Sequence, residues 1–354
     1  MSLQHFRAQG FRCLDDVDLL PDPRVNVIAG ANASGKTSLL EAIYYLGRGR
    51  SFRASGNREL IQTGQKQFTL FGLAEYEGQP HRVGVEVESG ARRIRIDEKN
   101  ATGADLAKIL PIQAIDPEIH NLVQGDPGFR RRFLDWGVFH VKHQFLAEWR
   151  RYQQALRQRN AALRQGEPDT AVFVWDAELV SSGESVDAMR TSFLESYLPK
   201  LSSIIDEKLP FDAKCSYRRG WSAECSLQEA LDSSRSRDRS MGFTQVGPHR
   251  ADLALGVHDR RARYRVSRGQ QKMLAAAMVI AQTYFVAENG ADDLILLVDD
   301  PAAELDQDNR QRLFALLQDI PAQMFIAALE PDDLPWLDNG NLFHVEHGKL
   351  SSRP

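Results

Sequence analysis

The chain has 354 residues, of which 42% are hydrophobic and 26% charged, and its formal net charge is −4 at pH 7. A chain of this length exceeds what one hydrophobic core usually holds, so we expect two lobes. No apolar run approaches the ~20 residues that span a bilayer, which excludes a membrane protein. The net negative charge excludes a surface that is basic overall, so any nucleic-acid site must be a local patch.

Two further features favour a cytoplasmic protein. The first seven residues, M-S-L-Q-H-F-R, carry charges where a signal peptide needs an apolar core. Cys13, Cys215 and Cys225 are scattered and form no C-x-x-C pair, which argues against a zinc site or a disulfide scaffold. We therefore expect a reducing, cytoplasmic compartment.

The first motif in chain order is a phosphate-binding loop (P-loop) over residues 30–37, G-A-N-A-S-G-K-T. It follows a short apolar run that predicts a buried strand, and a helix is expected from Lys36 to Leu46. In this context the glycines let backbone N–H groups surround a phosphate. Lys36 would add a positive charge at the β- and γ-phosphates, and the Thr37 hydroxyl would hold Mg²⁺. The predicted nucleotide-binding residues are Gly30, Ala31, Asn32, Ala33, Ser34, Gly35, Lys36 and Thr37.

Four arginines follow the P-loop helix in a Gly/Ser-rich stretch: Arg48, Arg50, Arg53 and Arg58. Guanidinium groups suit bidentate contacts to phosphate, so these residues are candidate DNA contacts. A solvated surface remains the alternative for every arginine cluster in the chain. The glycines favour an exposed, flexible loop here. Partial alternation then predicts strands over 67–75, 82–88 and 92–97.

The middle of the chain has helical periodicity. We expect helices over 126–164 and 172–209, joined by a short turn as an antiparallel hairpin whose apolar stripes serve packing. The segment 233–240 marks the return linker, and residues 250–266 predict a strand pair around His258 and Asp259. The chain would thus have an ATP-binding lobe from residues 1–115 and 241–354, interrupted by a helical lobe over 116–240.

Two motifs near the C-terminus complete the pattern. Ser267 is a natural N-cap for a helix that starts with S-R-G-Q, and free N–H groups there would face an anion. Residues 294–300 form an apolar run that ends in Asp299 and Asp300. Beside a P-loop, Asp299 would orient the magnesium shell and Asp300 would polarise the attacking water. Both patterns also occur as ordinary caps and turns.

The order of these motifs, ending in Glu304-Leu305-Asp306, resembles that of the ATP-binding-cassette (ABC) ATPases. The whole chain resembles the RecF family, within the SMC branch of these ATPases. The resemblance rests also on G-R-S-F-R at 49–53, R-R-F-L-D-W-G at 131–137 and G-P-H-R-A-D at 247–252. It implies an α/β fold, namely an ABC-type P-loop ATPase head with a mixed sheet flanked by helices and an inserted α-helical lobe.

The resemblance also implies site roles. Ser267, Gly269 and Gln270 would contact the γ-phosphate of ATP held by a second copy, and Asp306 would lie in the loop that crosses between the copies. Gln113 fits the position of a glutamine that couples the metal to the helical lobe. Similar proteins bind ATP, dimerise on it and bind DNA at single-strand gaps or junctions. With RecR and RecO they help load RecA, and they take part in replication restart and in the SOS response.

Some positions depart from the family or cassette pattern. Ala33 replaces a common glycine, Ala303 replaces a common serine, and no histidine follows the expected strand at 323–327. Asp300 stands where most cassette ATPases have glutamate, although RecF-like proteins share the aspartate. We therefore expect slow hydrolysis, that of a weak DNA-dependent ATPase, with ATP acting as a timed clamp.

Two alternatives stay open. A Rad50-like or condensin-like head would belong to the same ATPase class, but it needs a zinc hook or long heptad repeats, and this chain has neither. A P-loop kinase of small metabolites would need no S-x-G-Q helix. ATP-dependent dimerisation separates the cassette interpretation from the kinase, which has no reason to require it.

Overall fold

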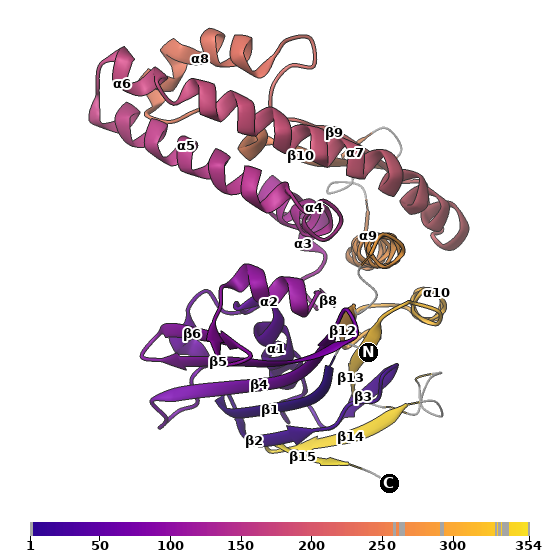
Figure 1. The fold of residues 1–354 in the computed structure, drawn as a ribbon. Helices are drawn as coiled ribbons and strands as arrows, with labels where there is room; N and C mark the ends of the chain where they lie inside the picture. The colour runs from indigo at the N-terminus through magenta and orange to yellow at the C-terminus, as the bar shows by residue number, and fades with distance from the viewer. Residues whose placement is uncertain are drawn as a thin grey trace. The chain divides into compact units, whose positions relative to one another are not determined.

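The computed structural model describes residues 3–257, 260–261, 266–290, 294–329, 331, 334 and 340–352. The chain divides into two compact units (Figure 1). Unit 1 comprises Met1–Ile119 and Ala276–Pro354, and unit 2 comprises His120–Ala275. The sequence placed the return to the ATP-binding lobe at residue 241, whereas here residues 241–275 group with unit 2. One reason is that β10 (Asp252–Val257) pairs with β9 (Lys214–Arg218).

Unit 1 contains an antiparallel six-stranded sheet in the order β2-β1-β4-β5-β6-β7. Predicted strands 67–75, 82–88 and 92–97 correspond to β4, β5 and β6. Alternating burial along β4 and β5 explains why the sequence pattern was readable. The strands are β1 (Leu3–Phe11), β2 (Leu14–Leu19), β4 (Gln67–Tyr76), β5 (Gln79–Glu88), β6 (Ala91–Ile96) and β7 (Lys99–Asn100).

The second sheet of unit 1 is mixed and has the order β15-β14-β3-β13-β12-β8. Neighbouring strands from β14 to β8 are parallel, and only β15 is antiparallel. Strands from both ends of the chain therefore meet in one sheet (Figure 1). The strands are β3 (Val25–Ala29), β8 (Ile112–Ile115), β12 (Ile295–Asp299), β13 (Gln323–Ala328), β14 (Asn341–Glu346) and β15 (Lys349–Ser352).

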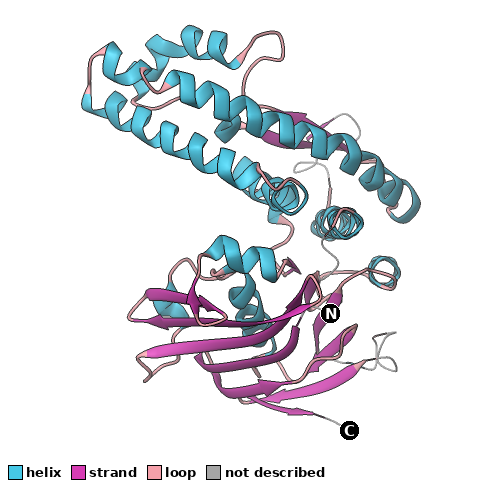
Figure 2. Ribbon diagram, viewed as in Figure 1, coloured by secondary structure: helices cyan, strands magenta, loops and turns pink. Residues whose placement is uncertain are grey.

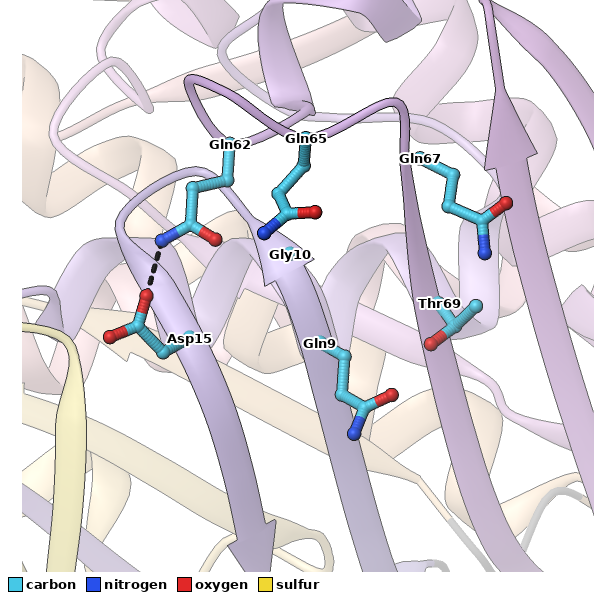
Figure 3. A pocket seen from close by; sticks show the side chains of 7 residues that line it. All are labelled: Gln9, Gly10, Asp15, Gln62, Gln65, Gln67 and Thr69. Carbon is cyan, nitrogen blue, oxygen red and sulfur yellow. Dashed lines mark hydrogen bonds between the residues drawn. The ribbon is translucent and has the colours of Figure 1, made fainter.

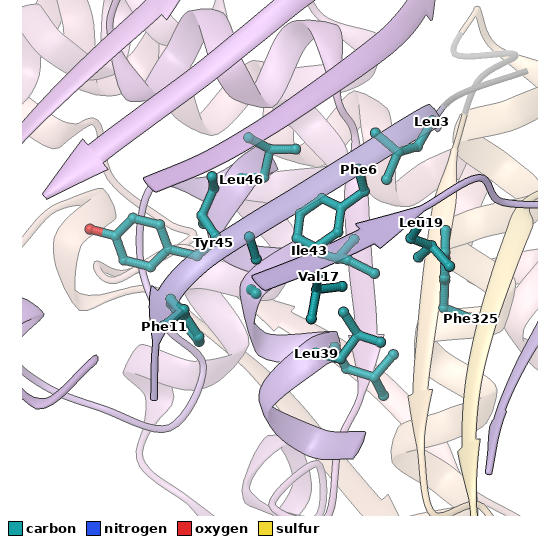
Figure 4. Close-up of a cluster of buried hydrophobic side chains, with 14 of the residues drawn as sticks. Leu3, Phe6, Phe11, Val17, Leu19, Leu39, Ile43, Tyr45, Leu46 and Phe325 are labelled. Carbon is teal, nitrogen blue, oxygen red and sulfur yellow. The ribbon is translucent and has the colours of Figure 1, made fainter. Parts of the chain in front are cut away.

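One hydrophobic core joins the two sheets through helix α1 (Lys36–Arg48). Figure 4 shows Leu39, Ile43 and Leu46 of α1 among side chains of β1, β2 and β13. Each such fully buried apolar side chain contributes roughly 1.5–3 kcal/mol. The core therefore holds rigidly the helix whose first turn follows the P-loop. The other helices of unit 1 are η1 (Asn57–Leu60), α2 (Gly103–Ile109) and α10 (Gln307–Leu317), and α9 (Arg268–Glu288) runs from unit 2 into unit 1.

Unit 2 is mainly helical (Figure 2). The helix predicted over 126–164 is two helices, α4 (Pro127–Val141) and α5 (Phe145–Gln165), because Lys142 adopts an extended conformation between them. The helix predicted over 172–209 is α7 (Asp176–Lys208), preceded by the short α6 (Asp169–Phe173). The remaining elements are α3 (Asn121–Gln124), α8 (Leu227–Met241), η2 (Pro248–Arg250) and a three-stranded sheet of β9, β10 and β11 (Arg260–Arg261).

Packing of α5 against α7 buries Tyr152, Leu156 and Leu179, as the apolar stripes predicted. The same interior holds an ion-pair network, because the fully buried Arg159 contacts Asp176 at 2.7 Å and Asp238 at 2.8 Å. The predicted strand pair consists of β10 and β11, whereas His258 and Asp259 lie outside the described residues. Within the described chain, no helix is both long and apolar enough to cross a membrane.

Candidate nucleotide site

The P-loop connects β3 to α1 in a conformation that only particular residues allow. Gly30 has φ 156° and Gly35 has φ 119°. A Cβ at Gly30 would lie 2.3 Å from the carbonyl oxygen of Val345, so any side chain there would clash. Ala33 also has a positive φ, of 62°. A non-glycine residue in this region costs roughly 1–2 kcal/mol, so replacement of the common glycine by Ala33 is tolerated but strained.

Lys36 lies across the P-loop. Its Nζ donates to the carbonyl oxygens of Gly30 at 2.8 Å and Ala31 at 2.9 Å. Burial lowers the pKa of Lys36, while the negative charges of Asp300 and Asp299 oppose that shift. The ammonium is therefore held where the loop would enclose a phosphate, and phosphate oxygens can replace the two carbonyl acceptors.

Thr37 and Asp299 form a pair that fits a magnesium ion. The Thr37 hydroxyl donates to Asp299 Oδ1 at 3.0 Å. Asp299 Oδ2 is buried and has no hydrogen-bond partner among the described residues. Burial raises the pKa of Asp299, so its charge is costly without a cation. Hydroxyl and carboxylate oxygens are the ligands that Mg²⁺ prefers, and the unpartnered oxygen is what such an ion would satisfy.

Asp300 follows β12 with a strained backbone. Its φ is 48°, a left-handed value that is unusual for aspartate, and its N–H donates to the carbonyl oxygen of Ala327 at 3.0 Å. Such strain persists where surrounding structure enforces it, and it is concentrated at functional sites. The negative charge of Asp300 opposes the burial that lowers the pKa of Lys36, so the two charges interact.

Asp116 is a carboxylate that the sequence interpretation missed. It follows β8, whose Ile115 pairs with Val298 of the parallel strand β12. The carboxyl ends of the two strands therefore bring Asp116 close to Asp299. Burial, together with the negative charge of Asp299, raises the pKa of Asp116 to about 6. The available signal was a second short apolar run that ends in aspartate, of the same kind as 294–299.

Gln113, the glutamine predicted to couple the metal to the helical lobe, bonds another glutamine. Its side-chain amide donates to Gln282 Oε1 of α9 at 2.6 Å. Both residues belong to unit 1. The contact couples β8 to α9 within this unit, and Gln113 is thus already engaged by a protein side chain. Asp116, directly after this strand, is the residue whose pKa is raised by the negative charge of Asp299 in addition to burial.

The arginine stretch after α1 is anchored at several points. Arg12 forms an ion pair with the buried Glu41 of α1, and the Ser51 hydroxyl donates to the same carboxylate. The rings of Phe52 and Tyr44 pack edge to face with centroids 5.2 Å apart. The expected loop is therefore tied to the P-loop helix.

The four candidate arginines differ in their environments. Arg50, Arg53 and Arg58 are exposed, whereas Arg48 is half-buried, with its guanidinium 5.8 Å from the Tyr44 ring centroid. Burial raises the pKa of both Asp299 and Asp116, and the positive charge of Arg53 partly opposes the shift at each. Arg53 is therefore close to the nucleotide site, a position that the sequence did not indicate.

The predicted cap at Ser267 has cap geometry, and Asp306, for which no cap was predicted, is a cap as well. The Ser267 hydroxyl accepts from the N–H of Gln270 at 3.3 Å, and the Gln270 side chain accepts from the N–H of Ser267 at 2.9 Å. This reciprocal pair fixes the start of α9, which contains Gly269. Asp306 caps α10 and accepts from both the backbone and the side chain of Asn309.

Unit 1 also contains an amide-lined cavity of about 340 Å³ near the ends of β1 and β4 (Figure 3). Gln9, Gln62, Gln65 and Gln67 contribute to its wall, and Gln62 donates to the carboxylate of Asp15 at 2.5 Å. The cavity contains none of the residues predicted for the nucleotide site. Its lining is four amides, a threonine and a glycine with the single carboxylate of Asp15.

Comparisons with known proteins identify the relatives of this chain. Residues 2–345 match the family model described as the RecF/RecN/SMC N terminal domain. The DNA replication and repair protein RecF of Pseudomonas putida (strain GB-1) is 43% identical over 99% of this chain and 98% of its own length. The protein of the same name from Stutzerimonas stutzeri (strain A1501) is also 43% identical, over 99% of this chain and 97% of its own.

Solved structures have the same fold. The recombination mediator protein RecF with ATP, described in the RecFOR pathway, superposes with a TM-score of 0.88 at 24% identity, covering 100% of this chain and 98% of its own. An Smc head domain from Pyrococcus furiosus, bound to the C-terminal domain of ScpA, has a TM-score of 0.61 at 16% identity and covers 99% and 96%. The expected fold class, an ABC-type ATPase head, is confirmed.

Proposed function

The chain belongs to the RecF family of DNA replication and repair proteins, and we propose that it is an ATP-dependent DNA clamp. ATP binds at the P-loop with Mg²⁺, two copies close on two nucleotides, and the dimer holds DNA. The observation that carries the proposal is the combination of an ammonium held on the P-loop, that of Lys36, with the Thr37–Asp299 pair. In that pair one buried carboxylate oxygen has no hydrogen-bond partner among the described residues.

ATP and magnesium fit the charges of this cluster. Lys36 and the P-loop N–H groups bind the phosphates, and Thr37 and Asp299 supply oxygen ligands for the metal. Asp300 polarises the attacking water. Because its side chain is one methylene shorter than glutamate, we expect slow hydrolysis and a weak, DNA-dependent ATPase. The bound ATP of the RecF structure described above supports the choice of nucleotide.

Dimerisation follows from the capped helix α9. Ser267, Gly269 and Gln270 of one copy contact the γ-phosphate held by the P-loop of the other, while Asp306 lies in the crossing loop. Each dimer then has two composite sites. The defined N-terminus of α9, with its positive dipole end, supports an anion partner.

DNA binding combines basic patches from both copies, because the single chain has a net charge of −4. Arg50 and Arg58 are exposed and suited to backbone phosphates, while Arg48 supports the loop from its contact with Tyr44. Arg53 lies close to the nucleotide site, so it can link DNA contact to ATP. Single-strand gaps and ss/ds junctions are the proposed substrates.

The cellular role proposed here is recombinational repair and replication restart in the cytoplasm. The clamp would act with RecR and RecO to help load RecA and so support the SOS response. Its support is the family membership together with the RecFOR pathway named for the related structure.

Sedimentation with ATP tests the clamp. Ser267→Arg should remain monomeric with ATP yet bind ATP as the wild type does, because the bulky side chain obstructs only the partner's triphosphate. Lys36→Ala should also remain monomeric, because it lacks its own ATP. A mixture of the two has one intact composite site and should form a weak heterodimer. Ser196→Arg, the same change at an exposed position of α7, is the matched control and should dimerise.

Two results would contradict the proposal. If Ser267→Arg dimerises at the same ATP concentration as the wild type, Ser267 is an ordinary helix cap and does not contact the partner's ATP. A wild-type protein that binds ATP but stays monomeric would favour the metabolite kinase. Phosphotransfer to small acceptors would then be the next measurement.

A further inference from the structure

Two sequence motifs without an assigned role meet at one cavity of unit 2. The cavity has a volume of about 460 Å³ and lies between the first turns of α4 and the turn η2. Its lining includes Asp126, Phe129, Arg131, Arg132, His249 and Arg250. The R-R-F-L-D-W-G and G-P-H-R segments are therefore neighbours in space, although they lie far apart in the sequence.

The cavity has an excess of positive charge. Three arginines line it, against the single carboxylate of Asp126. The nearby carboxylates of Asp252 and Asp135 are already paired, with Arg130 at 2.7 Å and with Arg190 at 2.8 Å. An anion is therefore the ligand class that the cavity favours.

Arg131 is held in place but is incompletely neutralised. Its Nη1 donates to the backbone oxygen of Ala251 at 2.7 Å, and burial together with the positive charge of Arg190 lowers its pKa. Arg250 is exposed at the cavity. A Cβ on Gly128 would lie 3.5 Å from Arg132 Nη1 and 3.8 Å from Arg131 Nη2. The guanidinium groups thus converge over a position that carries no side chain.

His249 forms a fixed, neutral wall. The Tyr152 hydroxyl lies 2.5 Å from Nδ1, and Nε2 lies 3.0 Å from the carbonyl oxygen of Thr244. A carbonyl oxygen only accepts, so Nε2 carries the proton and Nδ1 accepts from the tyrosine. The imidazole is therefore oriented before any ligand arrives, and it adds a flat surface rather than a charge.

Phe129 adds an aromatic surface at the same place. Its side chain is 41% exposed, which is unusual for a large apolar residue, and the Arg132 guanidinium lies 4.7 Å from its ring centroid. Packing alone does not require an exposed phenyl ring. Aromatic rings beside guanidinium groups are a recurring platform on which unpaired bases stack.

We propose that this cavity binds one nucleotide of a single DNA strand, with its phosphate on Arg131 and Arg250 and its base on Phe129. The volume suits a ligand larger than a bare phosphate, and the exposed ring favours a nucleotide over an acidic peptide. The proposal rests on the DNA binding proposed above and adds a contact site in unit 2. It gives the two segments a function in strand recognition.

The test measures DNA affinity of the full-length protein with ATP. The two probes are a single-stranded thymidine oligonucleotide and an abasic strand of the same length. Arg250→Glu should lower the affinity for both probes by roughly tenfold. It should also lower the slope of log affinity against log salt by about one phosphate contact. Phe129→Leu should weaken the thymidine probe by roughly fivefold or more and leave the abasic strand unchanged.

Arg157→Glu is the matched control, since Arg157 is an exposed arginine of α5 and the change in net charge is the same. It should weaken both probes much less than Arg250→Glu. Thermal melting checks the fold of each variant. If one unfolds, Arg250→Gln or Phe129→Met replaces it.

Each remaining outcome overturns a stated idea. If the wild-type protein binds no DNA, the proposed function is wrong, and the proposal that the unit 2 cavity binds a DNA nucleotide is wrong with it. If the wild type binds DNA but Arg250→Glu behaves like Arg157→Glu, only the cavity proposal fails, and an acidic protein segment becomes the better ligand. If Phe129→Leu weakens both probes equally, the ring does not stack on a base.

Discussion

The P-loop edge of unit 1 and the cavity of unit 2 each gather charges of one sign, and the two signs are opposite. At the P-loop edge Asp116, Asp299 and Asp300 gather, and burial raises the pKa of the first two. At the cavity arginines gather, and burial lowers the pKa of Arg131. In both places like charges are held together by the fold.

The sign of the charges indicates which kind of ligand each region favours. Charges of one sign that are held close together have a raised free energy, more so where they are buried, and an opposite charge lowers it. The carboxylates of unit 1 fit a cation, with Lys36 reserved for the phosphates. The guanidinium groups of unit 2 fit an anion directly.

Lys36→Met should give the largest effect. It removes the ammonium that lies across the P-loop, and loss of a charge-assisted contact costs about 1.5–3 kcal/mol, or roughly 10- to 100-fold in ATP affinity. Calorimetric titration with ATP measures it. Lys66→Met, at an exposed position of the same unit, is the control and should change nothing. ATP affinity of Lys36→Met within twofold of the wild type would refute the site.

Asp299→Asn should distinguish two effects of the carboxylate charge, namely its effect on the stability of the ligand-free protein and its contribution to Mg²⁺–ATP binding. It keeps the shape but removes the charge, so Mg²⁺–ATP affinity should fall by roughly tenfold. Without ligand the variant should be more stable than the wild type by about 1 kcal/mol, because a buried charge has been removed. Urea unfolding with and without Mg²⁺–ATP measures both. A variant destabilised in both conditions would show that Asp299 is structural.

His249→Asn should flatten the pH dependence of stability. Burial lowers the pKa of His249 to about 4, and Arg250 and Arg131 contribute. Between this value and the ordinary pKa near 6.5 the unfolded chain binds the proton and the folded chain does not, so stability falls as pH decreases. The wild type should lose about 1–2 kcal/mol more than the variant between pH 7 and pH 5. Equal losses would show that the imidazole protonates freely in the fold.

Arg53→Ala should have the smallest effect, and comparison with Arg50→Ala should distinguish the roles of the two arginines. Because Arg53 acts on the carboxylates of the nucleotide site, its removal should weaken ATP binding by roughly threefold, as expected for a partly exposed ionic contact. Arg50→Ala should leave ATP binding unchanged. Equal ATP affinities of the two variants would show that Arg53 does not contribute to ATP binding and is a candidate DNA contact only.

The sequence alone determined the features that are encoded locally. The P-loop lies within eight consecutive residues, between an apolar strand and a helix, so backbone conformation and phosphate chemistry could be inferred together. The Ser267 cap was equally readable, because a capping side chain bonds residues only a few positions away. Helix breaks were less visible, and the extended Lys142 divided a continuous helical pattern.

The tertiary structure alone decided which distant residues share a site. Asp116 meets Asp299 because β8 and β12 pair in parallel, a register that neither strand carries in its own sequence. Arg53 lies near the same edge because the loop after α1, which contains it, is anchored to Glu41 through Ser51. The arginine cavity forms only when α4 and η2 pack together. Local propensity sets the conformation of each segment, whereas non-local pairing sets the charge that a segment meets.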